Sequence, residues 1–324
     1  MKKSFFIILI IVILVLGGCG QSSDTFLLYR DTVSSVSYDN QNFMSEADFF
    51  ASDLAVIPLS ISSTEDAIIT SAAALLIDNA TNEKIYSDNI YEKRYPASIT
   101  KLFTALVVLK KGALTDSVTI SHEAANIPDP GAKKCGFEEG DIISLEALLN
   151  CMLIYSGNDA AIAIADHLGG TEEQFVTLMN EEAKRIGAVH SNFVNPHGLH
   201  DDNHYTTAYD IYLAFHKLIG YDTFRNIIKT SSYTAEYTDK DGNAKQKTFE
   251  TTNMYFTGEE EQPENMEILG GKSGTTYKAG DCLILLSRDA SGHEYISLIL
   301  KASGKELLYD EMGILFSFLG NNAP

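Results

Sequence analysis

The order in which the hydrophobic pattern changes along the chain most constrains its fold. Residues 71–89 contain two short apolar runs separated by the turn residues Asn-Ala-Thr-Asn, which predicts a β-hairpin. Apolar residues then recur at helical spacing, in segments that often end at glycine, which predicts a mostly helical middle. After residue 248 the pattern becomes strand-like, with turns at 277–280 and 289–292, and an amphipathic helix closes the chain.

This order of elements predicts an α+β fold. The first hairpin and the last strands are expected to share one antiparallel sheet flanked by helices, with a helical lobe inserted between them. Residues 66–324 are long enough for one large core or two intergrown lobes, and no internal repeat is visible. We therefore expect the folded domain to occupy 66–324.

The N-terminus has the pattern of a bacterial export signal. Residues 1–18, MKKSFFIILIIVILVLGG, carry two lysines, then a long aliphatic block and small residues. The alternative is an uncleaved signal-anchor helix, because the aliphatic block is nearly long enough to span a bilayer. Both interpretations place the protein outside the cytoplasm and tethered to the membrane.

The motif LGGC at 16–19 resembles the lipobox of bacterial lipoproteins. This resemblance implies that residues 1–18 are a lipoprotein signal peptide and that Cys19 is acylated and becomes the mature N-terminus. The protein would then be anchored to the outer face of the cytoplasmic membrane through its N-terminal lipid. Residues 19–65 are rich in Ser, Asp and Asn without a sustained period, which predicts a flexible tether.

Charge and cysteine content argue against two classes of protein. The formal net charge is −20, so nucleic acid is not an expected partner. If Cys19 carries lipid, three cysteines remain without a paired CxxC spacing, which excludes a zinc ribbon. Cys151 and Cys282 lie in apolar runs typical of core residues, while a disulfide between Cys135 and Cys151 stays open for an exported protein.

Ser98 and Lys101 form an SxxK pair at the start of an apolar helical run. Residues three apart lie on one helical face, so the lysine can reach the serine hydroxyl. The positive end of the helix also favours an anionic oxygen at Ser98. A free lysine is protonated at neutral pH, so Lys101 can act as a base only if burial or a second cation lowers its pKa.

Two further short elements could complete a site for acyl transfer. Lys272 lies in GGKSGTT, where glycines let a substrate backbone approach a strand edge, and it could supply the second cation. Ser156 and Asn158 lie at the polar corner between two predicted helices, the first of which begins at Ser144. They would provide a hydroxyl for proton relay and an amide for a substrate carbonyl.

The three elements in this order resemble the active-site set of the penicillin-recognising serine enzymes. The longer strings RYPASITK, SGNDAA, FVNPHGL and GGKSGTTYKAGDCL narrow the resemblance to the D-alanyl-D-alanine carboxypeptidases that trim peptidoglycan stem peptides. The resemblance implies the fold of serine β-lactamases and DD-peptidases, with a catalytic domain over 66–324. It also implies no cofactor and no metal, a peptidoglycan stem peptide as substrate, and β-lactam antibiotics as covalent inhibitors.

The resemblance also implies a role for each matched residue. Ser98 would be the nucleophile that forms an acyl-enzyme, and Lys101 its general base. Ser156 would relay a proton to the leaving D-alanine. Four residues would bind the substrate: Asn158 its amide, Lys272 and Ser273 its terminal carboxylate, and Thr275 its oxyanion, through a backbone N–H group paired with that of Ser98.

The chain departs from the family pattern at two points. Ser273 stands where many members have threonine, but the hydroxyl is kept, so activity is expected. The chain ends at residue 324, too soon after Lys272 for the small β-domain and amphipathic tail of many members. The N-terminal lipid is therefore expected to replace that tail as the anchor. A further cation for the carboxylate site is not apparent; Lys301 is a weak candidate.

Three other interpretations remain. A serine β-lactamase shares these elements, and EALLN at 146–150 imitates the ExxLN string of one class, but Glu146 precedes Ser156 and is interpreted as helix surface. A catalytically weak penicillin-binding sensor would keep the same residues. The loop NPHGLHDDNHYTT, with His197, His200 and His204, could suggest a metal site, but Pro196 and Gly198 make it a loop without a regular ligand face.

Overall fold

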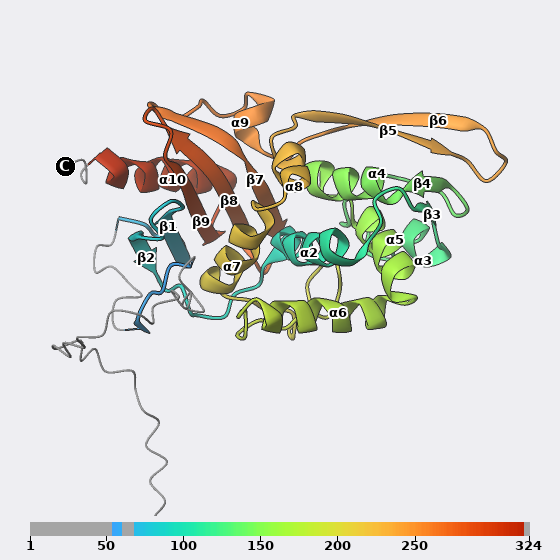
Figure 1. The fold of residues 1–324 in the computed structure, drawn as a ribbon, viewed down its shortest axis with the longest axis horizontal. Coiled ribbons are helices and arrows are strands. Elements are labelled where there is room, and N and C mark those ends of the chain that lie inside the picture. Colours follow the sequence, from blue (N-terminus) through green and yellow to red (C-terminus); the bar gives the residue numbers. More distant parts are fainter. Residues whose placement is uncertain (1–53, 60–67, 321–324) are drawn as a thin grey trace, which may run out of the picture. The chain divides into compact units, whose positions relative to one another are not determined.

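Strands from both ends of the chain pair in one antiparallel sheet (Figure 1). The computed structural model describes residues 54–59 and 68–320. The sheet has the order β2-β1-β9-β8-β7. Its strands are β1 (Ala73–Asp78), β2 (Lys84–Asp88), β7 (Met266–Thr276), β8 (Gly280–Asp289) and β9 (Glu294–Ala302). Because β1 pairs with β9, the first and last segments share a sheet, and the predicted α+β fold is confirmed.

The sheet is buried on both faces. Leu75 and Ile77 of β1 belong to the core that the helical lobe shares, whereas Ala74 and Leu76 belong to a second core beneath α10 (Lys305–Gly320). Side chains alternate between the two faces of a strand, so one continuous apolar run supplies both cores. The sheet is therefore a fixed frame for the residues at its edges.

Helices occupy most of the middle of the chain, as predicted. Ser144 accepts a hydrogen bond from the N–H of Ala147 and so caps α4, and Thr171 and Thr207 cap α6 and α7 in the same way. The helices are α2 (Lys101–Lys111), α3 (His122–Ala125), α4 (Leu145–Asn150), α5 (Asn158–Gly169), α6 (Glu172–Arg185), α7 (Ala208–Leu218), α8 (Asp222–Ile228) and α9 (Met254–Thr257).

A second antiparallel sheet in the helical lobe was not predicted. Its order is β3-β4-β5-β6. The strands are β3 (Ser117–Thr119), β4 (Ile142–Ser144), β5 (Ser232–Thr238) and β6 (Ala244–Glu250). The pair Asp241-Gly242 between β5 and β6 is a hairpin signal that could have revealed the long hairpin seen at the upper right of Figure 1. The mainly polar composition of β6 hid it, because that strand is exposed.

Residues 54–59 pack against the domain, although they lie within the range predicted as tether. Ala55 and Ile57 are buried. The backbone of Ala55 bonds to the hydroxyls of Tyr212 and Tyr209, and the hydroxyl of Tyr91 donates to Ile57. The packed domain therefore begins before residue 66, because two apolar side chains and their backbone groups find partners there.

The predicted signal peptide at 1–18 and the lipidation site at Cys19 lie outside the described residues, as do 20–53 and 60–67. None of the helices in the described part of the chain is long and apolar enough to cross a membrane.

Cys135, Cys151 and Cys282 are buried free thiols, so the structure contains no Cys135–Cys151 disulfide.

Candidate active site

Ser98 lies in a single 3-10 turn, Ala97–Thr100, that leads directly into α2. Its side chain is partly exposed, whereas Lys101 at the start of α2 is 0 % exposed. The predicted offset of three residues brings the two side chains onto one face, with Lys101 Nζ 3.0 Å from Ser98 Oγ. The site thus pairs an accessible hydroxyl with a buried amine.

The surroundings of Lys101 suit a neutral amine. Nζ donates to Asn158 Oδ1 at 2.7 Å and to the backbone oxygen of His197 at 2.8 Å. A neutral amine has two N–H groups and one lone pair. With both N–H groups directed at oxygen acceptors, the lone pair remains for the Ser98 hydroxyl. The predicted nucleophile and base therefore lie in the geometry that proton transfer requires.

The pKa of Lys101 is lowered to about 7, first by burial and further by the nearby Lys133 ammonium. Cys135 and Asp159 act in the opposite direction. The sequence suggested Lys272 as the neighbouring cation. Burial also lowers the pKa of Lys272 well below its ordinary value, followed by Lys101 and Lys133. The two buried lysines thus disfavour each other's charge, and Lys133 is a cation that the sequence analysis missed.

Lys272 on β7 joins the second and third predicted elements. Its Nζ donates to Ser156 Oγ at 3.0 Å and to the backbone oxygen of Ser273 at 2.8 Å. Ser156 follows a π-helical turn at Cys151–Tyr155 and has a left-handed backbone with φ of 72°. This conformation ends one helix and directs the hydroxyl toward β7 before α5 begins at Asn158.

The end of β7 runs directly against the nucleophile. A Cβ atom at Gly274 would lie 2.8 Å from the backbone nitrogen of Ser98, so only glycine allows this approach. Thr275 follows on the same strand, and its hydroxyl donates to Asp281 at 2.6 Å. The hydroxyl of Ser273 lies 2.7 Å from that of Thr252. The structure therefore brings together the predicted residues Ser98, Lys101, Ser156, Asn158, Lys272, Ser273 and Thr275.

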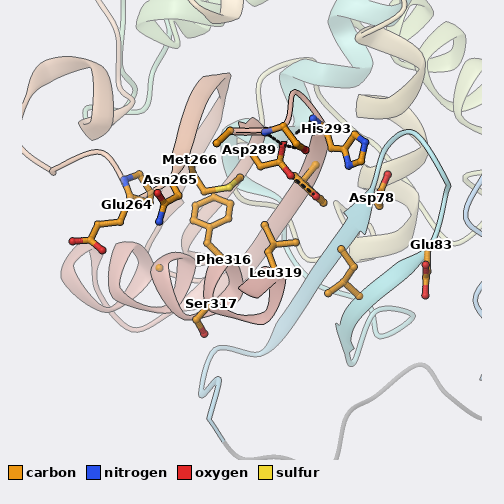
Figure 2. Close-up of a pocket in the computed structure, with 16 residues that line it drawn as sticks. Asp78, Glu83, Glu264, Asn265, Met266, Asp289, His293, Phe316, Ser317 and Leu319 are labelled. Carbon is orange, nitrogen blue, oxygen red and sulfur yellow. Dashed lines mark hydrogen bonds between the residues drawn. The ribbon is translucent and has the colours of Figure 1, made fainter. Parts of the chain in front are cut away.

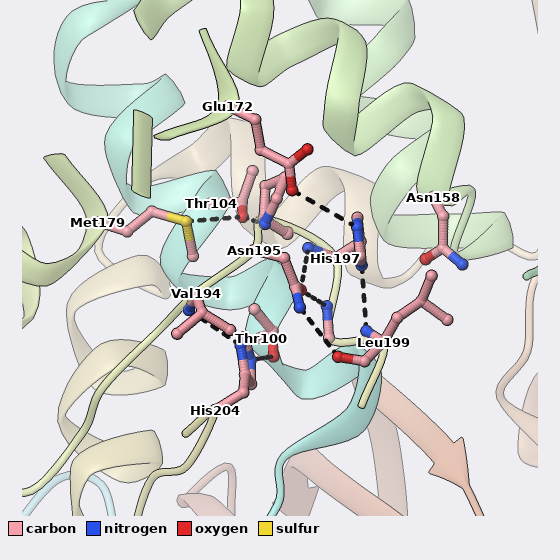
Figure 3. Close-up of polar contacts among 12 residues, drawn as sticks. Thr100, Thr104, Asn158, Glu172, Met179, Val194, Asn195, His197, Leu199 and His204 are labelled. Atoms are coloured by element: carbon pink, nitrogen blue, oxygen red, sulfur yellow. Dashed lines mark hydrogen bonds and ion pairs between the residues drawn. The ribbon is translucent and has the colours of Figure 1, made fainter. Parts of the chain in front are cut away.

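The loop at residues 195–204, called the histidine loop, contacts the segment that carries Ser98, and Figure 3 shows its His204 beside Thr100. Thr104 on α2 donates to the backbone oxygen of Pro196 at 2.6 Å, and Lys101 donates to His197. Gly198 has φ of +91°, and a Cβ there would lie 1.8 Å from the backbone oxygen of Ala97. Ala97, just before Ser98, itself has a positive φ of 48°. The loop thus holds the turn that presents Ser98.

His204 extends this support as a neutral side chain. Its Nδ1 accepts from the N–H of Val194, so Nε2 carries the proton and donates to Thr100 Oγ1 at 2.7 Å. Thr100 in turn donates to the backbone oxygen of Ala97 at 2.8 Å. Burial lowers the pKa of His204 to about 4. Among residues 54–59 and 68–320, no group of three ligating side chains could hold a metal ion.

A short loop around Lys133 completes the corner near Ser156. Lys133 accepts a hydrogen bond from the N–H of Asn158 at 2.8 Å, and its ammonium lies 4.1 Å from the centre of the Tyr155 ring. The buried carboxylate of Asp159 accepts from the N–H groups of Cys135 and Gly136. No sequence motif marks these residues, because only the folded loop brings them to the site.

Two side chains considered from the sequence, those of Glu146 and Lys301, make none of the hydrogen bonds described above. Glu146 is exposed on the first turn of α4, as its interpretation as helix surface predicted. Lys301 is exposed with φ of 61°. Lys305, at the start of α10, lies near enough to Lys133 to lower the pKa of that lysine after burial has done so.

A groove of about 1230 Å³ lies at the other end of β7 (Figure 2). Its acidic residues Asp78 and Asp289 accept hydrogen bonds from backbone N–H groups of their own turns. They therefore have a local structural role. The hydroxyl of Ser291 in this groove donates to Asp289 at 2.7 Å within the same exposed turn, whereas the pairing of a serine with a buried lysine lies around Ser98.

A serine hydroxyl beside a buried lysine base, with a second lysine and serine opposite, defines the class of active-site serine enzymes that work by acyl transfer. The family model described as D-alanyl-D-alanine carboxypeptidase matches residues 60–304, and the chain belongs to this family.

Individual relatives agree with this assignment. The chain is 34% identical to D-alanyl-D-alanine carboxypeptidase DacF of Bacillus subtilis strain 168 over 174 residues, 52% of this chain and 44% of that protein. It is 31% identical to DacC of Escherichia coli K12 over 251 residues, 75% of this chain and 59% of that protein. The chain thus spans about half the length of these curated relatives.

The fold also matches a solved structure. The crystal structure of the Streptomyces K15 DD-transpeptidase aligns with a TM-score of 0.71 at 24% identity, covering 79% of this chain and 98% of that chain. At this identity the match supports the fold alone.

Proposed function

We propose that the protein is a penicillin-binding serine D-Ala-D-Ala carboxypeptidase that removes the terminal D-alanine from peptidoglycan stem pentapeptides. The observation that carries this proposal is the buried amine of Lys101, 3.0 Å from Ser98 Oγ, with its two other contacts on carbonyl oxygens. Such an amine can accept the serine proton at neutral pH. Membership of the carboxypeptidase family supports the choice of substrate.

In the proposed acylation, Lys101 removes the proton of Ser98 as Oγ attacks the carbonyl carbon of the penultimate D-alanine. The oxyanion is held by the backbone N–H groups of Ser98 and Thr275. The bond from that carbonyl carbon to the nitrogen of the terminal D-alanine then breaks. Ser156, which accepts a hydrogen bond from Lys272, passes its proton to the leaving nitrogen and regains one from the protonated Lys101, which becomes neutral again. This leaves an ester on Ser98.

In the proposed deacylation, water attacks the ester carbon while Lys101 accepts its proton. The ester bond breaks and Ser98 Oγ is reprotonated, which restores the free enzyme. During acylation, Lys272 and the hydroxyl of Ser273 bind the carboxylate of the terminal D-alanine, and Asn158 binds the substrate amide. Lys133 adds positive potential on the same side of the site.

Intact-mass analysis with benzylpenicillin, followed by incubation with a D-Ala-D-Ala pentapeptide, tests this function. We expect one penicillin adduct per chain, no adduct on Ser98→Ala, and release of D-alanine by the wild type. A stable adduct without D-alanine release would indicate the sensor, and rapid turnover of penicillin would indicate a β-lactamase. If the Ser98→Ala variant still formed a penicillin adduct, Ser98 would not be the nucleophile.

We also propose that the protein is a lipoprotein anchored to the outer face of the bacterial cytoplasmic membrane. The motif LGGC at 16–19, after a charged and then aliphatic leader, supports this proposal. Cys19→Ser is expected to release the protein from the membrane or to leave its signal uncleaved. Mass analysis of wild-type protein that found no acyl chains would contradict the proposal.

A further inference from the structure

A cavity of about 430 Å³ lies next to the catalytic cluster. It shares His197 with that cluster, since the backbone oxygen of His197 accepts from Lys101. Ile162, one helical turn beyond Asn158 on α5, also lines it, so the cavity continues the face on which Asn158 lies. Its apolar wall is formed by Ile127, Pro128, Ile162 and Leu199.

Three carboxylates from the part of the chain that the structure describes line this cavity, those of Glu123, Asp129 and Glu172, and only that of Glu172 lies within 4.0 Å of His197. Glu172 is the first residue of α6, and its side chain is 39% exposed. Its closest basic partner is His197, with Nε2 3.8 Å from Oε1, which is too long for a hydrogen bond (Figure 3). Among the described residues, no lysine or arginine lies within 4.0 Å of Glu172.

The imidazole of His197 does not neutralise that carboxylate. Its Nδ1 accepts from the N–H of Leu199 at 3.1 Å, so Nε2 carries the single proton of a neutral ring. Burial lowers its pKa well below the ordinary value, and Lys101 lowers it further. The side chain is only 8% exposed, and within the described chain its Nε2–H has no hydrogen-bond acceptor. The cavity thus offers a carboxylate and an N–H donor to a ligand.

The assigned roles set the direction of the substrate. The leaving D-alanine lies toward Lys272 and Ser156, because these groups bind its carboxylate and protonate its nitrogen. The rest of the stem must therefore leave Ser98 on the other side, past Asn158. From there, Ile162 is about 6 Å further along α5, four residues at 1.5 Å each. The residue before the two D-alanines thus comes to the mouth of the cavity.

We infer that this cavity binds the side chain of the third stem residue, as an aliphatic chain that ends in an ammonium group paired with Glu172. The inference rests on the proposed function and specifies its substrate class. The apolar wall covers the methylene groups, and the carboxylate binds the terminal amine. Cross-linking converts that amine to a neutral amide, so this subsite favours stems that are not cross-linked.

Two peptides that differ only in this charge test the inference. The probes are Nα-acetyl-L-Lys-D-Ala-D-Ala, with a free ε-amine, and Nα,Nε-diacetyl-L-Lys-D-Ala-D-Ala, which lacks it. The wild type is expected to hydrolyse the free amine with a kcat/KM about fivefold or more higher, the effect of one partly buried ionic hydrogen bond. Glu172→Gln should remove most of this difference in kcat/KM, because only Glu123 and Asp129 would then supply carboxylates to the cavity.

Glu173→Gln is the matched control. It removes the same charge from the same helical turn, but Glu173 does not line this cavity, so the preference for the free amine should remain. Uptake of one benzylpenicillin per chain by each variant shows that it is folded. Equal rates for both peptides in the wild type, or an unchanged preference in Glu172→Gln, would overturn the subsite. Failure to hydrolyse either peptide would instead overturn the proposed carboxypeptidase function.

Discussion

Lys101 Nζ lies 3.0 Å from Ser98 Oγ, and its other two hydrogen bonds go to the carbonyl oxygens of Asn158 and His197. A protonated lysine would place all three N–H groups on oxygen atoms and keep no lone pair for the serine proton. In the proposed mechanism, the catalytic form is therefore the one in which burial has removed the proton of Lys101. This relationship makes acylation of Ser98 dependent on pH.

The acylation rate should rise with pH up to about 7 and be nearly constant above it, because the pKa of Lys101 is lowered to about 7. Below that value Lys101 is protonated, so the rate should fall about tenfold per pH unit. The second-order rate constant of acylation by benzylpenicillin, measured between pH 5 and 9, describes this fall in rate at low pH, here called the acidic limb. A rate that still rose about tenfold per pH unit near pH 9 would show that burial does not lower the pKa of Lys101 in this way.

Lys133→Ala should move that limb to higher pH by a few tenths of a unit. Lys133 is a cation near Lys101, and its loss lets Lys101 keep its proton to higher pH. The shift is small because Lys133 is exposed and solvent screens its charge. Lys134→Ala removes the neighbouring exposed charge and should leave the limb in place. If both variants behave alike, Lys133 acts only through net charge.

Lys272→Ala should lower kcat/KM for a D-Ala-D-Ala peptide about a hundredfold or more, the scale of one lost electrostatic stabiliser. Lys272→Arg should retain part of the rate, since it keeps the charge on a wider planar group. The acidic limb of Lys272→Ala should also move to higher pH, because the two buried lysines disfavour each other's charge. D-Alanine release across pH measures both effects. An unchanged limb would mean that Lys272 only binds the carboxylate.

Gly198→Ala should slow acylation tenfold or more and destabilise the fold by about 2 kcal/mol, because the new Cβ would collide with Ala97 next to the nucleophile. Gly292→Ala is the control. It has a similar φ of +94°, with nothing within 4 Å of the added atom. It should therefore carry the backbone strain without loss of acylation. Urea unfolding of both variants measures the cost of backbone strain, and their rates of acylation by penicillin measure the displacement of Ser98.

Ile57→Ala should lower the free energy of unfolding by about 2 kcal/mol or more, because Ile57 is buried against the domain. Val56→Ala, at a side chain that is 70% exposed, should change it by less than about 0.5 kcal/mol. Thermal unfolding of the purified proteins measures the difference. Equal stability of the two variants would show that residues 54–59 do not pack against the domain and belong to the tether.

The element order and the placement of Lys101 beside Ser98 were predictable because local patterns specify them. Alternation and turn residues mark the outer strands, and helical periodicity with capping residues marks the helices of the lobe. The offset of three between Ser98 and Lys101 fixes a shared face in any helical turn. The polar strand β6 was not predicted, because an exposed strand has no alternation of apolar side chains by which to recognise it.

The chemical state of the site depends on tertiary structure. Nothing in RYPASITK shows that Lys101 becomes fully buried, or that its two N–H groups meet carbonyl oxygens from Asn158 and His197, both distant in sequence. The sequence indicated Lys272 as the cation near the base, whereas the folded loop also brings Lys133 there. A pKa is set by desolvation and by charges a few ångströms away, and these distances exist only once segments far apart in the chain have packed together.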